Sequence, residues 1–260
     1  MAGDLLLARA GQHTLDPLIV PQAHRRWEIG ATVWDSEADG DYLIFPYTGV
    51  AVLQAHIDGA RIMVGTVGAD GAIGLIEDDA APRWTSTARA ITAVEGWRIA
   101  RSEFETAIRE DSILAATITA YVRLLTLEAR HEVICRTRHR APERVAGWLA
   151  HVFDLAEHHE LHLTQNAIAD WFGVQRTTLN SIAKTLKGTG AIRHRRDKIC
   201  LADRERLGRL GCDCRARMAE DRAHLGLPLP QRVEEPSGQH VRTLPGSDAF
   251  AARLSKSLAT

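Results

Sequence analysis

The segment from Arg176 to Lys198 concentrates side chains that could contact DNA. It carries arginines, lysines and small hydroxyl residues, and Asp197 is its only acid. Arginine can form two hydrogen bonds to a guanine edge, threonine can contact the methyl group of thymine, and lysine neutralises a phosphate. The segment therefore predicts non-covalent recognition of double-stranded DNA. No nucleophile elbow, phosphate-binding glycine loop or HExxH pattern is present, so we expect no catalytic residues and no enzyme activity.

The spacing around this segment predicts two helices that would position these side chains. Thr164 can cap a short helix with one apolar side, and Gly173 permits the tight turn with positive φ that ends it. A second helix, about residues 175–187, has its apolar residues at helical spacing and leaves polar residues such as Asn180 outside. Residues 192–201 then alternate around a turn as a basic hairpin wing.

The DNA-binding roles follow from the positions in this predicted winged helix-turn-helix. We assign phosphate contacts to Thr164, Gln175 and Thr178, base contacts to Arg176, Thr177 and Ser181, an outward-facing cation to Lys184, and backbone contacts beside the wing to Arg195 and Arg196. The alternative is an ordinary helical hairpin with a solvated charged face. We favour DNA binding because the turn glycine, apolar corner, polar outer face and basic wing occur together and in order.

Short runs of β type, broken by glycine, fill the region from residue 25 to residue 99. We expect strands within residues 27–34, 41–57, 60–67, 72–76 and 88–99. The Asp58-Gly59 pair between two alternating runs is a strong signal for a hairpin. So many strands in a short span predict an antiparallel barrel or jelly roll.

A helical region follows the predicted strands. Ser102 begins a short helix, and Ser112 begins a long one that runs to Arg138. Its apolar residues recur at steps of three and four, which predicts a dimer interface made by Leu114, Ile118, Tyr121, Val122, Leu125 and Ala129. Packing on the chain's own barrel takes part of this set, but a helix of about 25 residues spans nearly 40 Å, longer than one small barrel needs. Pro142 then begins a helix, to about residue 159, that carries the DNA-binding module.

Composition places the protein in a reducing cytoplasm, with no membrane partner. The 260 residues contain four cysteines, at positions 135, 200, 212 and 214, which are too few for a secreted disulfide scaffold. No signal-peptide pattern is present, and no continuous apolar run approaches membrane-spanning length. We expect a structural or incidental role for the cysteines. We also expect no metal site, either there or among His151, His158, His159 and His162, because no matching carboxylate or cysteine pattern accompanies these histidines.

The order of barrel, long helix and winged helix resembles the bacterial cyclic-AMP receptor protein and fumarate-nitrate regulator (Crp-Fnr) family of transcription regulators. The segments that carry the resemblance are LIFPYTGVAVL, DGARIMVGTVGADGAIGL, CRTRHRAPERVAGWLA, LTQNAIADWFGVQRTTL and GCDC, which look like landmarks of a subgroup lacking the standard nucleotide signature. The resemblance implies an α+β fold with a cyclic-nucleotide-binding-like β-roll over residues 1–110, a dimerisation helix over 111–139 and a winged helix-turn-helix over 140–226. Residues 227–260 form a tail that we expect to be disordered.

The chain departs from the family pattern where cyclic AMP binds. The family's ribose-binding Gly-Glu corresponds to Gly71 and Ala72, and its phosphate-binding Arg-Ser corresponds to the neighbourhood of Arg83 and Thr85. The acceptor for the ribose is therefore missing, although Arg83 and Thr85 remain able to meet an anion. We expect no cofactor: cyclic AMP is disfavoured, and an iron-sulfur cluster is disfavoured because the first 134 residues contain no cysteine.

The sequence thus predicts a homodimeric regulator that binds an inverted-repeat operator and works with RNA polymerase. It leaves open whether an unidentified small molecule controls the β-roll. Thr177 and Ser181 stand where the family usually has a glutamate and a second arginine, so we expect a changed half-site. The alternative is a ligand-sensing module whose main output is protein interaction and whose DNA binding is weak or non-specific.

Overall fold

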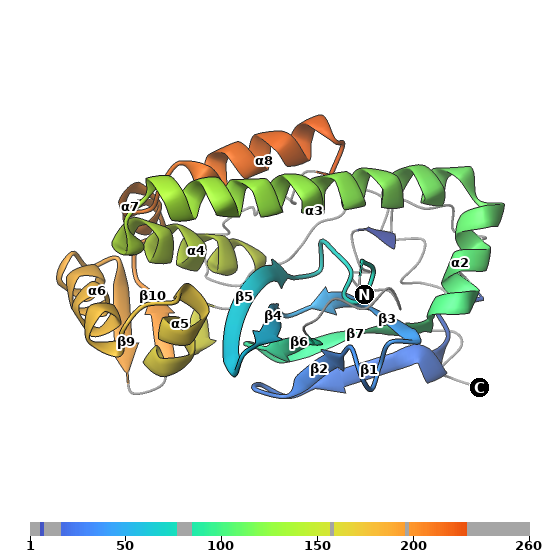
Figure 1. Ribbon diagram of the computed structural model, residues 1–260, viewed down its shortest axis with the longest axis horizontal. Coiled ribbons are helices and arrows are strands. Elements are labelled where there is room, and N and C mark those ends of the chain that lie inside the picture. The colour runs from blue at the N-terminus through green and yellow to red at the C-terminus, as the bar shows by residue number, and fades with distance from the viewer. Residues whose placement is uncertain (1–5, 8–16, 77–84, 157–158, 196–197, 228–260) are drawn as a thin grey trace, which may run out of the picture.

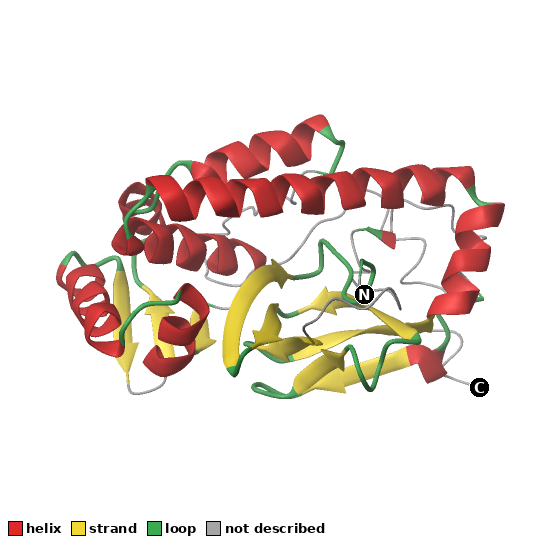
Figure 2. Cartoon of the chain, viewed as in Figure 1, coloured by secondary structure: helices red, strands yellow, loops and turns green. Residues whose placement is uncertain are grey.

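The computed structural model describes residues 6–7, 17–76, 85–156, 159–195 and 198–227. A β-roll is followed by one long helix and then by a winged helix-turn-helix at the opposite end of the molecule (Figure 1). Helices and strands are segregated along most of the chain and mix only in the C-terminal part (Figure 2). The predicted α+β class and order of parts are confirmed. The predicted tail beyond residue 227 lies outside the described residues.

The β-roll consists of two antiparallel sheets. A three-stranded sheet has the order β1-β7-β3, and a four-stranded sheet has the order β2-β6-β4-β5. A short 3-10 helix, η2 (Pro21–Ala23), precedes the first strand. The strands are β1 (His24–Trp27), β2 (Thr32–Asp35), β3 (Tyr42–Thr48), β4 (Ala51–Ile57), β5 (Ala60–Val67), β6 (Thr85–Ala90) and β7 (Val94–Ala100).

Glycines set the strand boundaries as the sequence indicates. The β4–β5 hairpin turns at Asp58 and Gly59, with φ of 49° and 75°, as the Asp-Gly pair predicts. Gly49 separates β3 from β4 with φ of 79°, and a Cβ there would lie 2.0 Å from the carbonyl oxygen of Ala93. Only glycine fits that position, because both the space and the backbone conformation exclude a side chain.

Two predicted strands differ from the structure. The run 72–76 forms no strand and makes only an isolated bridge between Ile73 and Ile44. The run 27–34 is split into β1 and β2, in different sheets, around Gly30, whose φ is 82°. In both runs most apolar residues are buried or half-buried, but Ile29 and Ile76 are 42% and 57% exposed. Pairing partners elsewhere in the chain decide whether a strand forms.

Three helices connect the β-roll to the DNA-binding part: α2 (Arg101–Glu110), α3 (Ser112–Arg138) and α4 (Ala141–Leu155). The predicted bounds of α3 are confirmed. Asp111 caps it by accepting hydrogen bonds from the backbone N–H groups of Ile113 and Leu114, at 2.8 and 3.0 Å. The prediction that the next helix continues to residue 159 was wrong. Helix α4 ends at Leu155, and a strand that the sequence analysis did not foresee follows, β8 (Glu160–His162).

The C-terminal part alternates short helices and strands. Its elements are α5 (Gln165–Phe172), α6 (Arg176–Gly188), β9 (Ile192–Arg195), β10 (Lys198–Leu201), α7 (Arg204–Leu210) and α8 (Cys214–His224). The predicted hairpin is therefore part of a three-stranded sheet of order β8-β10-β9. Helix α8, also not predicted, runs back along α3 (Figure 1).

Helix α3 buries one side in the chain's own core, which changes the predicted dimer interface. Leu114, Ile118 and Tyr121 are at most 8% exposed and pack with aromatic residues such as Phe104. Leu125 is half-buried against the same cluster. Leu114, Ile118 and Tyr121 are therefore held by the chain's own β-roll and α2, whereas Leu125 keeps part of its surface accessible. Of the predicted set, Val122 and Ala129 remain exposed.

Among the described residues, α3 is the helix long and apolar enough by composition to cross a membrane. The sequence predicted no membrane-spanning segment. However, α3 packs along α8 and α2. It also carries Arg123, Glu128 and Arg130 near its middle, and charged residues there are costly in lipid. We therefore interpret α3 as the core helix of a folded domain.

A buried ion pair joins α8, α3 and the β-roll. The Arg222 side chain is 4% exposed, and its guanidinium lies 2.8 Å from the carboxylate of Asp70 and 2.9 Å from that of Glu128. Asp70 follows β5, and its carboxylate also accepts a hydrogen bond from the N–H of Gly68. Burial raises the pKa of Glu128, and the charge of Arg222 opposes that shift. One guanidinium thus holds together three segments that are far apart in the sequence.

We expect Arg222→Leu to lower the free energy of unfolding by about 3–5 kcal/mol, because it leaves two buried carboxylates without their cation. Arg215→Leu is the matched control on the same helix. Arg215 is 42% exposed and pairs with Asp154, so its loss should cost less than about 1 kcal/mol. Urea unfolding followed by circular dichroism measures the free energy of unfolding of both variants. Equal small losses would show that Arg222 does not hold α8.

Candidate DNA-binding site

Local sequence signals build the turn between α5 and α6. The Thr164 hydroxyl accepts a hydrogen bond from the N–H of Ala167 at 3.2 Å and so caps α5. Gly173 ends α5 with φ of 63° and ψ of 37°, the left-handed conformation that glycine adopts without strain. Val174, half-buried against the core, occupies the corner between the helices. The predicted cap, turn and corner are confirmed.

The inner faces of the two helices share one apolar core with α4. Leu179, Ile182 and Leu186 of α6 are at most 4% exposed. On the other side, Trp148 of α4 makes edge contacts with Trp171 and Phe172 of α5, with ring centroids 5.9 and 5.6 Å apart. This packing fixes the orientation of α6 and therefore the direction of its outer face.

The outer face of α6 and its N-terminus are exposed and polar. The exposed residues are Gln175, Arg176, Thr177, Thr178, Asn180, Ser181 and Lys184. No acid lies in the first turn of α6, and within the described part of the chain no carboxylate pairs with Arg176 or Lys184. The unsatisfied N–H groups of this first turn add a positive dipole end. The structure thus gathers the predicted residues of α6 on one surface suited to an anionic partner.

The wing is less basic than predicted. Strands β9 and β10 form the expected antiparallel pair, and Arg193 is exposed. Lys198, which the sequence analysis counted among the wing's cations, is half-buried instead. Its amino group lies 2.5 Å from the carboxylate of Glu160 on β8, and this hydrogen bond lowers the pKa of Glu160. The unforeseen strand β8 therefore neutralises one cation. Arg195 ends β9, and Arg196 lies outside the described residues.

The DNA-binding part packs against the β-roll through α4 and α5. The indole N–H of Trp148 donates to the hydroxyl of Thr66 on β5 at 3.1 Å, and Arg61 on β5 lies 3.6 Å from the carboxylate of Asp170 on α5. Apolar residues of the roll, such as Val52, belong to the same core cluster as the helix-turn-helix. Helix α6 lies beyond α5, at the end of the molecule away from the roll (Figure 1), which leaves its outer face open.

The described residues of the predicted effector site are Gly71, Ala72 and Thr85. Gly71 and Ala72 are buried beneath α3: the N–H of Ala72 donates to the phenolic oxygen of Tyr121 at 3.1 Å, and a Cβ on Gly71 would lie 2.2 Å from that oxygen. Burial also raises the pKa of Tyr121, which keeps the phenol neutral. Thr85 begins β6, opposite His56, and Arg83 lies outside the described residues. The described members of this set thus form no open anion site.

A cavity of about 430 Å³ lies between the roll, α3, α4 and α8. Apolar side chains such as Leu53, Met63 and Phe172 line most of it, and Glu128 and His151 add polar groups. Burial and the charge of Arg222 lower the pKa of His151 to about 4, so this histidine is neutral at physiological pH.

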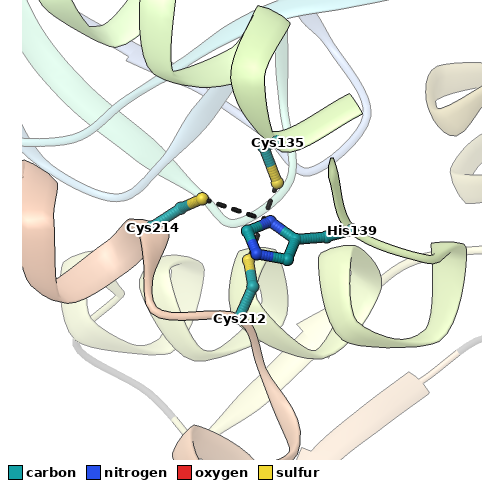
Figure 3. A group of neighbouring side chains, drawn as sticks. All are labelled: Cys135, His139, Cys212 and Cys214. Carbon is teal, nitrogen blue, oxygen red and sulfur yellow. Dashed lines mark hydrogen bonds between the residues drawn. The ribbon is translucent and has the colours of Figure 1, made fainter. Parts of the chain in front are cut away.

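A cluster of metal-ligand residue types borders this cavity, at cysteines for which the sequence indicated a structural or incidental role and no metal site. Cys135, His139, Cys212 and Cys214 point toward one another (Figure 3). The available signals were the spacings Cys-x-x-x-His at the end of α3 and Cys-x-Cys before α8. These two pairs are more than 70 residues apart in sequence, so only the return of α8 along α3 brings them together.

Comparisons with known proteins agree with this architecture. Residues 143–210 match the family of the Crp-like helix-turn-helix domain. A solved regulator of the crp/fnr family from Eubacterium rectale has a TM-score of 0.59 and 16% identity, covering 79% of this chain and 96% of its own. FixK2 from Bradyrhizobium japonicum has a TM-score of 0.59 and 21% identity, covering 73% of this chain and 96% of its own. The c-di-GMP-responsive regulator CLP from Xanthomonas campestris has a TM-score of 0.52 and 15% identity, covering 76% of this chain and 97% of its own. No curated protein sequence matches the chain.

The domain match and the shared fold agree with each other. Residues 143–210 carry a Crp-like helix-turn-helix domain, and most of the chain shares the fold of solved Crp/Fnr regulators. The resemblance stated from the sequence is confirmed for this domain and for the fold.

We expect acid to destabilise the fold through His151. Because its pKa is lowered in the folded chain, the unfolded chain takes up a proton first as the pH falls below about 6.5, and stability is lost between that pH and about 4. This loss should be on the order of 3 kcal/mol and should disappear in His151→Gln. His224→Gln, at an exposed position on α8, is the control and should keep the wild-type slope. Urea unfolding at several pH values measures it, and an unchanged slope in His151→Gln would contradict the assignment.

Proposed function

We propose that the protein is a homodimeric, sequence-specific DNA-binding transcription regulator that acts on an inverted-repeat operator. The observation that carries the proposal is the outer face of α6, which is exposed, polar and free of acids from Gln175 to Lys184. Helix-turn-helix proteins place such a helix in the major groove, with the residues of its N-terminal turns against the base edges.

The positions on α6 separate base contacts from phosphate contacts. Arg176 is the first residue of α6 and is exposed, so its guanidinium can reach a guanine edge when the helix end enters the groove. Thr177 and Ser181 lie about one turn apart on the exposed surface and would read neighbouring base pairs. Thr164 and Gln175 precede the two helices, where hydroxyl and amide groups can position phosphates.

A second stripe on α3 supports dimerisation. It follows a heptad pattern with alternating steps of three and four residues and is apolar apart from Arg123, Arg130 and Thr137. It lies largely on the side of the helix away from the buried core, although Ala120 packs at the edge of that core. We define this partner-facing stripe as Ile113, Ala116, Ala120, Arg123, Leu127, Arg130, Ile134 and Thr137. All of these residues are exposed or half-buried, and Ile113 and Ile134 are 59% and 52% exposed. A second copy of α3 would cover them.

Pairing through α3 would place two α6 helices on one side of the dimer. Two recognition helices related by a two-fold axis enter successive major grooves about 34 Å apart, which requires an inverted repeat. We expect such a dimer to act in the cytoplasm and to work with RNA polymerase, as its regulator class implies.

We also propose the cavity of about 430 Å³ as the place where a small-molecule effector binds. A ligand there would contact β5 of the roll, α3 of the dimer and α4 of the DNA-binding part at once. Its mostly apolar lining favours a compact, largely apolar molecule over a cyclic nucleotide.

We predict that Arg176→Ala weakens binding to the specific operator by about 1–3 kcal/mol and weakens binding to random DNA much less, because a base contact is lost while phosphate contacts remain. Fluorescence anisotropy at fixed salt with both duplexes measures the difference. Arg109→Ala, on α2 at the far end of the β-roll, should change neither affinity. Equal losses on both duplexes would show that Arg176 only positions the protein.

A new charge on α3 should have different effects inside and outside the partner-facing stripe. Ile134→Glu places a carboxylate in the partner-facing stripe and should convert the dimer largely to monomer, whereas Val122→Glu, 38% exposed and off the stripe, should leave the dimer intact. Sedimentation velocity at low micromolar concentration measures the outcome. The reverse pattern would restore Val122, as predicted from the sequence, to the interface.

A further inference from the structure

Three thiols and one imidazole converge where α3 ends and α8 begins. Cys135 lies in the last turn of α3, and His139 is the residue that ends it, with its N–H bonded to the carbonyl of Cys135. Cys212 lies on the connection from α7 to α8, and Cys214 is the first residue of α8. Their four potential ligand atoms all lie within 4.8 Å of one another (Figure 3).

Two of the six distances among these atoms match the edges of one tetrahedral site, and the other four are at most 4.8 Å. The sulfurs of Cys135 and Cys212 are 3.6 Å apart, and the sulfur of Cys214 is 3.5 Å from Nδ1 of His139. Around a tetrahedral zinc ion, with Zn–S of about 2.3 Å and Zn–N of about 2.0 Å, two sulfurs lie about 3.8 Å apart and a sulfur and a nitrogen about 3.5 Å apart. Both observed distances therefore agree with those of a tetrahedral zinc site to within about 0.2 Å.

The surroundings of the histidine also suit a metal ligand. Nδ1 faces the cysteines, while Nε2 lies 3.7 Å from the carboxylate of Asp213. A carboxylate on the far nitrogen of a ligand histidine fixes the ring and favours the tautomer whose other nitrogen binds the metal. Arg217 in turn holds Asp213, with hydrogen bonds of 2.7 and 2.9 Å. The Cys-Asp-Cys segment thus supplies two ligands and the partner of a third.

The backbone is built to bring the two segments close. A Cβ on Gly211 would lie 2.7 Å from the Cα of Gly147, so α4 and the segment before Cys212 touch through two glycines. The N–H of Cys212 donates to the carbonyl of Glu143 on α4 at 3.3 Å. This contact holds Cys212 beneath the end of α3.

The geometry points to a binding site for one Zn²⁺ ion, with Cys135, Cys212 and Cys214 as thiolate ligands and His139 as the imidazole ligand. Four protein ligands close the coordination sphere, which is the pattern of a structural rather than a catalytic zinc site. Soft thiolates in a tetrahedral arrangement favour zinc over the hard cations. An iron-sulfur cluster spreads its ligands over several metal atoms and needs wider spacing than these four side chains show.

The ion would cross-link the end of α3 to the start of α8. Helix α4, which carries the helix-turn-helix, begins two residues after His139. The ion would therefore fix the elbow between the predicted dimerisation helix and the DNA-binding part. The loss of zinc should loosen this elbow without removing any residue that faces DNA.

The test uses the full-length protein, purified under reducing conditions without added chelator. We expect about one zinc per chain by elemental analysis, and after chelation and Co²⁺ addition we expect the visible bands of tetrahedral, thiolate-bound cobalt. Cys135→Ser and Cys214→Ser should lose the metal on buffer exchange. Cys200→Ser should retain it, because Cys200 lies on β10 next to Glu160 and outside the cluster. Asp213→Asn should bind about 10-fold more weakly.

The melting temperature provides a test that is independent of the metal content. Adding Zn²⁺ to the chelated wild type should raise its melting temperature by several degrees, because the ligand binds only the folded chain. The same addition should not shift Cys214→Ser. If the serine variants fail to fold, the chelation and refilling of the wild type still decide the question.

Three results would overturn the proposal. One is a reduced wild type that contains no zinc and takes up no cobalt. Another is equal metal loss in Cys200→Ser, and the third is a disulfide between Cys135 and Cys212 as the stable form in place of a metal. Metal content does not depend on the proposed DNA binding, so a failed operator experiment would leave this test intact.

Discussion

The ion pair of Arg222 with Asp70 and Glu128 is the interaction on which the arrangement of the parts depends. A buried cation is tolerated only with close partners, and these two carboxylates come from the roll and from α3. The pair therefore sets where α8 lies along α3. Because α8 begins at Cys214, its position also decides where the Cys-Asp-Cys segment meets the end of α3. One electrostatic constraint thus shapes both the cavity and the proposed metal site.

In helix α6, the residues that stabilise the fold differ from the residues proposed to contact DNA. Leu179, Ile182 and Leu186 hold α6 on the shared core, while Arg176 and its neighbours make no contact that the fold requires. Such a surface can change its base preference without loss of stability, because exposed substitutions away from caps and pairs cost little. Specificity and stability reside on opposite faces of one helix.

Local signals in the sequence predicted the elements that depend on neighbours in the chain. The cap at Thr164, the glycine at position 173, the Asp58-Gly59 turn and the bounds of α3 all follow from short-range chemistry. The features that were missed depend on distant pairing. Strand β8 exists because β10 lies beside it, and it is this strand that neutralises Lys198. The orientation of α3 and the meeting of Cys135 with Cys214 likewise require the tertiary fold, because helical spacing alone cannot say which side faces a partner.

The central claim is that the dimer reads two half-sites related by a two-fold axis. Selection of the purified protein on a random duplex library at physiological salt tests it most directly, because no operator has to be assumed. The account predicts an enriched inverted repeat whose half-site centres lie one helical turn, about 34 Å, apart. An enriched single half-site would contradict the dimer geometry. The absence of any enriched motif would contradict sequence-specific binding and favour a module that acts through protein contacts.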